Sequence, residues 1–401
     1  MAGEVVAAKH SNSDSVSHHH YHHHHNHSSS SNQKLHQAYL ALQAWKRVIY
    51  SDPNNFTSDW VGPSVCKYNG VYCAPSPYDP NIHVVAGIDL NHADIAGFLP
   101  DELGLLCDLA LFHINSNRFC GILPQSWANL TLLYELDLSN NRFVGPFPSV
   151  VLSLPTLKYL DIRYNEFEGP LPSELFSKDL DAIFVNNNRF TSVIPSNFNG
   201  SSASVVVFAN NKFGGCLPPT IAKFANTLEE LLLTNTSLSG CLPPEVGFLY
   251  KLKVLDVSFN KLVGPIPYSI TGLTWLEQLN LAHNMMTGVV PIGVCVLPNL
   301  ANFTFSYNFF CEEEGICQNL TSKGIAFDDR RNCLPDKPLQ RSKKECEAVH
   351  PVDCFEYHCM GGGGSNSNGS FGGATALAPA MVPALAPPMV APSIAPGPGL
   401  T

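Results

Sequence analysis

The chain has 401 residues, of which 45% are hydrophobic, so it is long enough to bury a sizeable core. Its formal net charge of -10 at pH 7 argues against a nucleic-acid partner, which needs a basic surface, and favours basic partners. The sequence contains no apolar run of about 18 residues such as a transmembrane helix requires.

Residues 1–34 are polar and carry a histidine tract between His18 and His27. The tract is either a metal-binding segment or a solvated low-complexity leader. We expect a disordered leader and no specific metal site, because nothing in the sequence fixes the geometry of the imidazoles. The first ten residues also lack the apolar region of a signal peptide.

Residues 35–84 are expected to form an N-terminal cap. Leu35, Tyr39 and Leu42 fall at helical spacing, and the helix is expected to stop before Pro53. Cys66 and Cys73 come after this helix and are separated by a short loop. Because the exposed end of a solenoid needs a cover with a polar outer face, we expect these two cysteines to form a disulfide within that cover.

A motif centred on asparagine recurs from residue 85 to residue 310. Apolar residues stand eight, five and three positions before it, as Leu133, Leu136 and Leu138 do before Asn141. This period predicts a leucine-rich-repeat solenoid of about ten turns, since one turn cannot bury its apolar side chains alone. The motif positions, 23 to 25 residues apart, are Ala93, Asn117, Asn141, Asn165, Asn188, Asn211, Thr236, Asn260, Asn284 and Asn308.

Each turn is expected to contain one short strand. The alternation in Leu136-Asp137-Leu138 places two side chains inward and one outward. The asparagine after the strand can bond backbone groups of adjacent turns, each bond being worth about 1 kcal/mol net.

The chain has 13 cysteines. Cys216 and Cys241 occupy the same place in successive turns, and turns stack about 4.8 Å apart, so we predict that they pair. The cysteines between residues 311 and 360 show no paired C-x2-C spacing of a zinc site, so a disulfide-tied C-terminal cap is expected, with its connectivity open. Cys107 and Cys120 are the candidates for unpaired or intermolecular thiols.

The expected fold class is α/β: a leucine-rich-repeat solenoid with disulfide-tied caps and disordered ends. After the asparagine the motif continues as N-x-[FL]-x-G-x-[IFL]-P, as in NRFVGPFP at 141–148, which resembles the plant-type version of this repeat. Residues 361–401 read as a Gly/Ser linker followed by a Pro/Ala-rich tail that builds no core. The expected division is therefore 1–34 leader, 35–84 cap, 85–310 solenoid, 311–360 Cys-rich cap, and 361–401 linker and tail.

Cysteines together with N-x-[ST] sequons indicate a secreted chain. A sequon in a secreted protein is an acceptor for N-linked glycan. We expect glycosylation at Asn55, Asn129, Asn199, Asn235, Asn302 and Asn319.

Several strings outside the repeat core are specific. ALQAWKRVIYSDPNNFTSDWVG, LALFHINSNRFCG and KDLDAIFVNNNRF resemble the N-terminal part of plant leucine-rich repeat extensins, including the pollen extensin-like members, and the similarity covers residues 35–359. The resemblance implies a secreted protein of the cell wall that captures small basic Cys-rich peptides of the rapid alkalinisation factor type. It also implies association with wall polysaccharide, homodimers and a link from wall to growth control. The tail departs from the family, because it has no serine followed by a proline run and no tyrosine.

The outward strand positions predict a binding surface on the inner face of the solenoid. This row is acidic in the early turns and apolar in the middle, and we expect the apolar residues to form an exposed patch beside acids that orient a basic partner. The alternative is that the acids are solvated and the apolar residues covered. The predicted peptide-binding residues are Glu135, Asp137, Tyr159, Asp161, Phe184, Val207, Leu232 and Asp256.

No catalytic motif is present in the sequence, so we expect neither an enzyme nor a cofactor. Glu166 and Glu168 are spaced like a glycosidase pair but follow the repeat, as solvated turn residues do. Two other functions remain open: an inhibitor of secreted pectin-degrading enzymes, and a structural wall glycoprotein.

Overall fold

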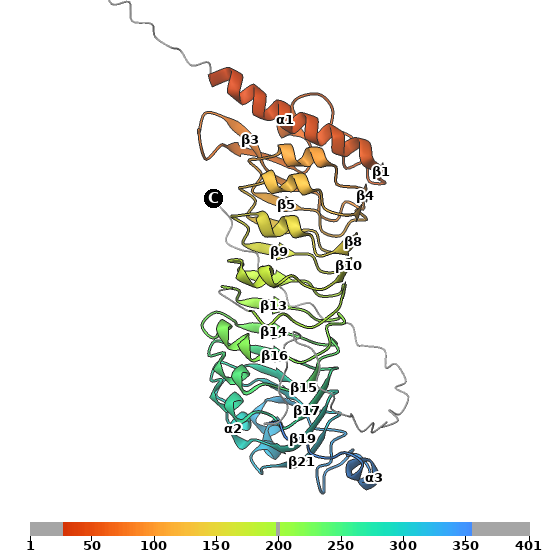
Figure 1. Ribbon diagram of the computed structural model, residues 1–401, viewed down its shortest axis with the longest axis vertical. Coiled ribbons are helices and arrows are strands. Elements are labelled where there is room, and N and C mark those ends of the chain that lie inside the picture. Colours follow the sequence, from red (N-terminus) through yellow and green to blue (C-terminus); the bar gives the residue numbers. More distant parts are fainter. Residues whose placement is uncertain (1–26, 198–200, 355–401) are drawn as a thin grey trace, which may run out of the picture. The chain divides into compact units, whose positions relative to one another are not determined.

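One short strand from each turn joins a common ladder (Figure 1). The computed structural model describes residues 27–197 and 201–354. Within them a twelve-stranded sheet is parallel except where β2 pairs antiparallel with β3. Its strands are β2 (Val71–Pro75), β3 (His83–Asp89), β5 (Leu111–His113), β7 (Glu135–Asp137), β9 (Tyr159–Asp161), β11 (Ala182–Phe184), β13 (Val205–Val207), β14 (Glu230–Leu232), β16 (Val254–Asp256), β18 (Gln278–Asn280), β20 (Asn302–Thr304) and β22 (Ala326–Asp328).

In the turns that have it, the motif asparagine bonds its turn to the one before it. Asn141 Nδ2 donates to the carbonyl oxygens of Ile114, at 2.9 Å, and Leu138, at 3.1 Å, while its Oδ1 accepts from the backbone N–H of Phe119 at 3.0 Å. The side chain is buried, and its Oδ1 is the partner of the buried Phe119 N–H, which water cannot reach. The carbonyls of Ile114 and Leu138 also accept from the motif asparagines Asn117 and Asn165. The predicted role of the asparagine is thus present in the structure.

The other two sides of the turns carry lateral strands and 3-10 helices. The lateral strands are β1 (Ile49–Ser51), β4 (Ala96–Gly97), β6 (Cys120–Gly121), β8 (Arg142–Pro146), β10 (Glu166–Gly169), β12 (Arg189–Phe190), β15 (Ser239–Cys241), β17 (Lys261–Gly264), β19 (Met285–Val290) and β21 (Phe309–Glu313). The 3-10 helices of the repeats are η2 (Asp101–Leu105), η3 (Gln125–Asn129), η4 (Ser149–Ser153), η5 (Ser173–Ser177), η6 (Pro219–Phe224), η7 (Pro244–Phe248) and η8 (Tyr268–Gly272). A proline with extended backbone precedes each of them and fixes the entry of the chain.

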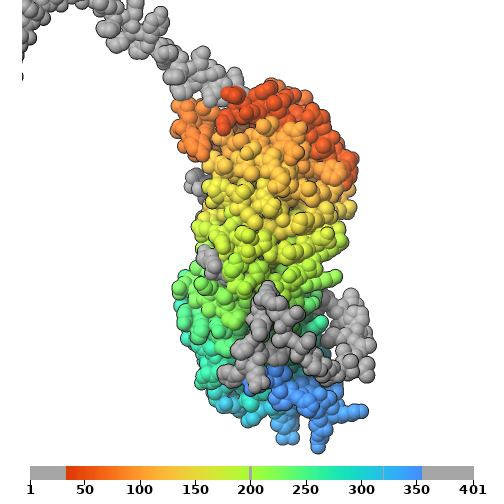
Figure 2. Space-filling model, in the orientation of Figure 1, coloured from red at the N-terminus to blue at the C-terminus, as the bar shows by residue number. Residues whose placement is uncertain are grey.

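A continuous core runs between these three sides. Phe143, Phe167, Phe190 and Phe213 stand in successive turns with their ring centroids 6.3 to 6.4 Å apart and their planes within 11° of parallel. All four are buried. The turns follow one another in sequence order as bands of colour on the surface (Figure 2).

The N-terminal cap contains a helix that is longer than predicted. α1 (His27–Val48) starts within the segment expected to be a disordered leader and ends before β1, five residues ahead of Pro53. Trp45, a residue of α1, packs against Trp60, Phe112 and Phe119, with ring centroids 5.5 to 5.8 Å apart. The cap therefore closes the first turns with aromatic side chains.

The disulfides agree with the cap prediction and correct the solenoid prediction. Cys66 is bonded to Cys73, the pair expected from their spacing. The predicted pair of Cys216 with Cys241 is wrong, because Cys241 is bonded to Cys354, 113 residues away. Cys216 is disulfide-bonded as well. The predicted bond was possible because Cys216 and Cys241 lie in adjacent turns of the stack, but Cys241 is bonded instead to Cys354, which lies beyond the repeats.

Two further disulfides hold the C-terminal part. Cys295, in α2 (Ile292–Cys295), is bonded to Cys317, and Cys333 is bonded to Cys346 in α3 (Lys343–Glu347). The remaining helices and short 3-10 segments are η1 (Val65–Lys67), η9 (Cys317–Asn319) and η10 (Thr321–Lys323). Among the described residues the free thiols are Cys107 and Cys120, as expected, and Cys311.

The ladder continues one turn beyond the predicted end of the solenoid at residue 310. β22 pairs in parallel with β20, and Asn332 Nδ2 donates to Phe305 O at 3.1 Å, as the motif asparagines do. The sequence signal was weak here because Gly324 and Asp329 stand where the other turns have apolar residues.

Residues 1–26 of the predicted leader, and the 361–401 tail, lie outside the described residues. Within the described parts of the chain, no helix has the length and apolar character to cross a membrane.

Candidate functional site

The outward side chains of the twelve-stranded sheet form what we call the sheet face. Its central row contains one residue from each parallel strand, set side by side by the register, as for Asp137 with Asp161 and Phe184 with Val207. Along the chain the row reads Asp89, His113, Asp137, Asp161, Phe184, Val207, Leu232, Asp256, Asn280, Thr304 and Asp328. All eight predicted peptide-binding residues lie on this face.

The aspartates of the central row turn the chain at the end of each strand. Asp137 Oδ1 accepts from the backbone N–H of Ser139 at 2.9 Å and from its hydroxyl at 2.6 Å. Asp256 makes the same two bonds to Ser258, at 2.8 and 2.6 Å. Both carboxylates remain partly exposed. One oxygen of each therefore stabilises the turn, while the charge still contributes to the field over the sheet face.

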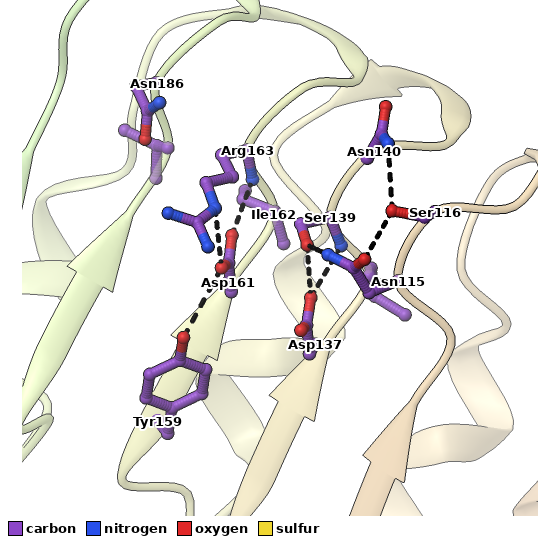
Figure 3. A network of polar contacts seen from close by, with 12 residues as sticks. Asn115, Ser116, Asp137, Ser139, Asn140, Tyr159, Asp161, Ile162, Arg163 and Asn186 are labelled. Carbon is purple, nitrogen blue, oxygen red and sulfur yellow. Dashed lines mark hydrogen bonds and ion pairs between the residues drawn. The ribbon is translucent and has the colours of Figure 1, made fainter. Parts of the chain in front are cut away.

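Asp161 differs from these aspartates because it is fully buried. Figure 3 shows its contacts with Tyr159 and Arg163. Its Oδ2 lies 2.9 Å from Arg163 Nε and accepts from the Tyr159 hydroxyl at 3.4 Å, and its Oδ1 accepts from the Arg163 backbone N–H at 3.1 Å. Burial, reinforced by the nearby charge of Asp137, raises the pKa of Asp161 to about 7. The expected outward contact is wrong for this residue: Asp161 cannot touch a ligand directly, and it positions Arg163 and Tyr159 instead.

Tyr159 is half-buried beside that carboxylate. Its burial and the charges of Asp161 and Asp137 raise the pKa of the phenol. The hydroxyl therefore stays protonated and remains a hydrogen-bond donor across the ordinary pH range. Tyr159 forms the border between the acidic strands and the apolar ones.

The apolar centre of the face is continuous but mostly covered by its own packing. Phe184 is 7% exposed and Val207 is 8% exposed, so the expectation that both are exposed is wrong. They form a cluster with Ala182 and Ala209, separate from the main core, against which Tyr159, Val205 and Leu232 pack with part of their surfaces accessible. The ring centroids of Tyr159 and Phe184 lie 5.7 Å apart, and the guanidinium carbon of Arg163 lies over the Phe184 ring, 5.2 Å from its centroid.

Phe184 and Val207 are covered by side chains on the neighbouring strands. Neighbouring strands lie about 4.8 Å apart, which is within the contact distance of large side chains in register. The pattern of one turn predicts that the Phe184 side chain points outward. The exposed fraction of that side chain also depends on the turns before and after it. Leu232, Val205 and the edge of Tyr159 are left as the accessible apolar surface of the site.

Glu135, an acid predicted in the early turns, has 36% of its side chain exposed. Its Oε2 lies 3.1 Å from His113 Nε2 on the neighbouring strand. Glu135, Asp137, Tyr159 and Asp161 are thus brought together on β7 and β9. Asp256 lies on β16, beyond the apolar cluster, so acids flank that cluster on both sides.

Sequence reasoning did not place Arg163, His113 and Asn186 in the site. Arg163 covers both Asp161 and Phe184, and Asn186 Oδ1, close by in Figure 3, is buried without a hydrogen-bond partner in the described part of the chain. The signal was available in the register, because Arg163 follows Asp161 by two residues on the same outward side. Among the described residues, no group of three or more His, Cys, Asp or Glu side chains could hold a metal ion.

Known proteins share both the sequence and the fold of this chain. The family model described as Leucine Rich Repeat matches residues 132–154, 156–177 and 251–273. Pollen-specific leucine-rich repeat extensin-like protein 3 of Arabidopsis thaliana is 65% identical over 333 residues, which are 82% of this chain and 46% of that protein. Leucine-rich repeat extensin-like protein 7 of the same plant is 62% identical over 333 residues, which are 82% of this chain and 76% of that protein. This chain thus spans about half the length of the first of these relatives.

A solved structure with the same fold contains a peptide ligand. It is the Arabidopsis receptor kinase HAESA in complex with the peptide hormone IDA and the co-receptor SERK1. The match has a TM-score of 0.66 and 28% identity, and it covers 74% of this chain and 50% of that one.

Proposed function

Since this chain belongs to the leucine-rich repeat extensin-like proteins, we propose that it is a non-enzymatic binding protein of the plant cell wall that captures small basic Cys-rich signalling peptides on its sheet face. Peptides of the rapid alkalinisation factor type are the proposed ligands. Capture of such a peptide would link the wall to the control of growth.

The proposal rests on one observation: acidic side chains flank a partly exposed apolar cluster on both sides. Glu135 and Asp137 lie on one side and Asp256 on the other, with Leu232 and Val205 accessible between them. A folded basic peptide offers cationic side chains around an apolar surface, which complements this pattern. Opposite charges would raise the rate of encounter and fix the orientation of the peptide.

A similar solved structure and the disulfides of this chain support the same proposal. The receptor kinase HAESA, whose solved structure has this fold, is found in complex with a peptide hormone. The disulfides fit an extracellular compartment, and the extensin-like names of the relatives fit a cell-wall location. Wall polysaccharide and a second copy of the chain are further proposed partners.

The test is a calorimetric titration of the full chain, secreted with its disulfides intact, with a folded basic Cys-rich plant peptide at low and at high salt. We expect binding that weakens as salt rises, because salt screens exposed charges beyond about 8 to 10 Å. Absence of heat at both salt concentrations, from protein shown to be folded, would overturn the proposal. The same sample would then enter a pectinase assay, where loss of enzyme activity would favour the inhibitor function.

A further inference from the structure

One of the predicted glycosylation sequons lies on the sheet face itself. Asn302, Phe303 and Thr304 form β20, and Phe303 is fully buried on the core side. Asn302 and Thr304 therefore project from the opposite side, in the rows that contain the candidate ligand-binding residues. Asn302 is exposed, and Thr304 Oγ1 donates to its Oδ1 at 3.2 Å.

The surroundings of Asn302 leave room for a large substituent. Its register partners are Gln278 on β18 and Ala326 on β22, and both are exposed. Ala326 presents only a methyl group, and Gln278 is a flexible side chain at the surface. In the described part of the chain, the Asn302 amide nitrogen donates no hydrogen bond, so attachment of a sugar to it breaks no contact there.

The sequon asparagine at Asn235 provides a contrast. Asn235 Nδ2 donates to Asn210 Oδ1 at 3.0 Å, and the next residue, Thr236, is fully buried. Asn129 resembles Asn302 in being exposed, but it ends η3 on another side of the turn. Among these three, Asn302 alone combines an open acceptor with a place on the sheet face.

We propose that Asn302 carries an N-linked glycan and that this glycan forms the C-terminal boundary of the ligand-binding site. The second half of the proposal rests on the proposed function. Neighbouring strands are about 4.8 Å apart, so a glycan on β20 covers its neighbours β18 and β22. Asp256, the last predicted ligand-binding residue, is on β16, two strands or about 10 Å from the attachment strand and beyond the neighbour that the innermost sugars cover. A peptide would therefore bind between β7, which carries Glu135, and β16.

Glycan occupancy can be measured without any ligand. The full chain, secreted from plant cells, is digested and treated with peptide-N-glycosidase A in ¹⁸O water, and mass spectrometry locates each asparagine converted to labelled aspartate. We expect label at Asn302 and at Asn129, the positive control. Labelled Asn129 with unlabelled Asn302 would overturn the proposal.

The boundary is tested by moving the sequon one strand toward the site. Gln278→Asn with Asn280→Thr creates an acceptor on β18, in a chain that also carries Asn302→Gln. Once its glycan is confirmed, we expect peptide affinity to fall at least about tenfold, and enzymatic removal of the glycan to restore it. The single variants Asn302→Gln and Asn129→Gln should keep the wild-type affinity within about twofold.

Two results would overturn the boundary. Full affinity with a glycan on β18 would show that the ligand does not approach β16, and a loss of affinity in Asn302→Gln would place Asn302 or its glycan inside the site. If the wild-type chain binds no peptide, the proposed function fails, while the mass spectrometry still decides whether Asn302 is glycosylated.

Discussion

Arg163 holds the carboxylate of Asp161 at both oxygens, with its Nε 2.9 Å from Oδ2 and its backbone N–H donating to Oδ1 at 3.1 Å. This contact lies at the border between the acidic strands and the apolar cluster of the sheet face. Because Arg163 also covers the Phe184 ring, the buried acid connects the two halves of the candidate site.

The raised pKa of Asp161 predicts a pH-dependent stability. Burial raises its pKa from 3.8 to about 7, so in that interval the folded chain binds a proton that the unfolded chain has released. Stability should therefore fall as pH rises from about 4 to 7, with a contribution on the order of a few kcal/mol. Asp161→Asn removes this contribution. Urea unfolding at pH 5 and pH 8 should show the variant gaining stability relative to wild type at the higher pH, and parallel pH curves would contradict the assignment.

Asn141 should be more important for stability than the exposed Asn140 beside it. Asn141→Ala leaves the buried backbone N–H of Phe119 without a partner, and we expect a loss of about 2 to 3 kcal/mol. The carbonyls of Ile114 and Leu138 each lose one bond but still accept from Asn117 and Asn165. Asn140→Ala is the matched control. It loses one exposed bond and places alanine at a φ of 53°, which costs about 1 to 2 kcal/mol. Equal losses in urea unfolding would show that the ladder of asparagines is not the main tie between turns.

Between residues 85 and 310 the repeat period was sufficient to predict one sheet strand in each turn, the register of these strands and the role of Asn141, because these depend on one turn and its copies. It did not predict the lateral strands. The burial of Asp161 was not predictable in this way, since it requires Tyr159 and Arg163 to adopt particular side-chain conformations. The bond from Cys241 to Cys354 joins parts 113 residues apart, and no local spacing encodes it. Prediction therefore succeeded for the backbone of the site and failed for the exposure of individual side chains.

Cys354 should be required to tie the C-terminal part to the solenoid. Cys354→Ser breaks a bond that closes a long loop and leaves the buried thiol of Cys241 unpaired, so we expect a loss of about 2 to 5 kcal/mol. Cys311→Ser, which removes a free and exposed thiol, is the control and should change little. Peptide mapping without reduction should recover Cys241 linked to Cys354. Recovery of Cys241 linked to Cys216 would contradict the structure.

The charge of Asp137 can be removed without disturbing its turn, which makes it the sharpest test of the acidic border. Asp137→Asn keeps an oxygen for the N–H and hydroxyl of Ser139, and Glu135→Gln is similarly conservative. Each neutralisation should weaken a basic peptide about threefold to fivefold, equivalent to about 1 kcal/mol or less, and reduce the salt dependence of binding. Glu102→Gln, an exposed acid in η2 outside the sheet face, carries the same charge change and should leave the titration unchanged. If all three variants weaken binding equally, the peptide responds to net charge alone, and the sheet face is not where it is held.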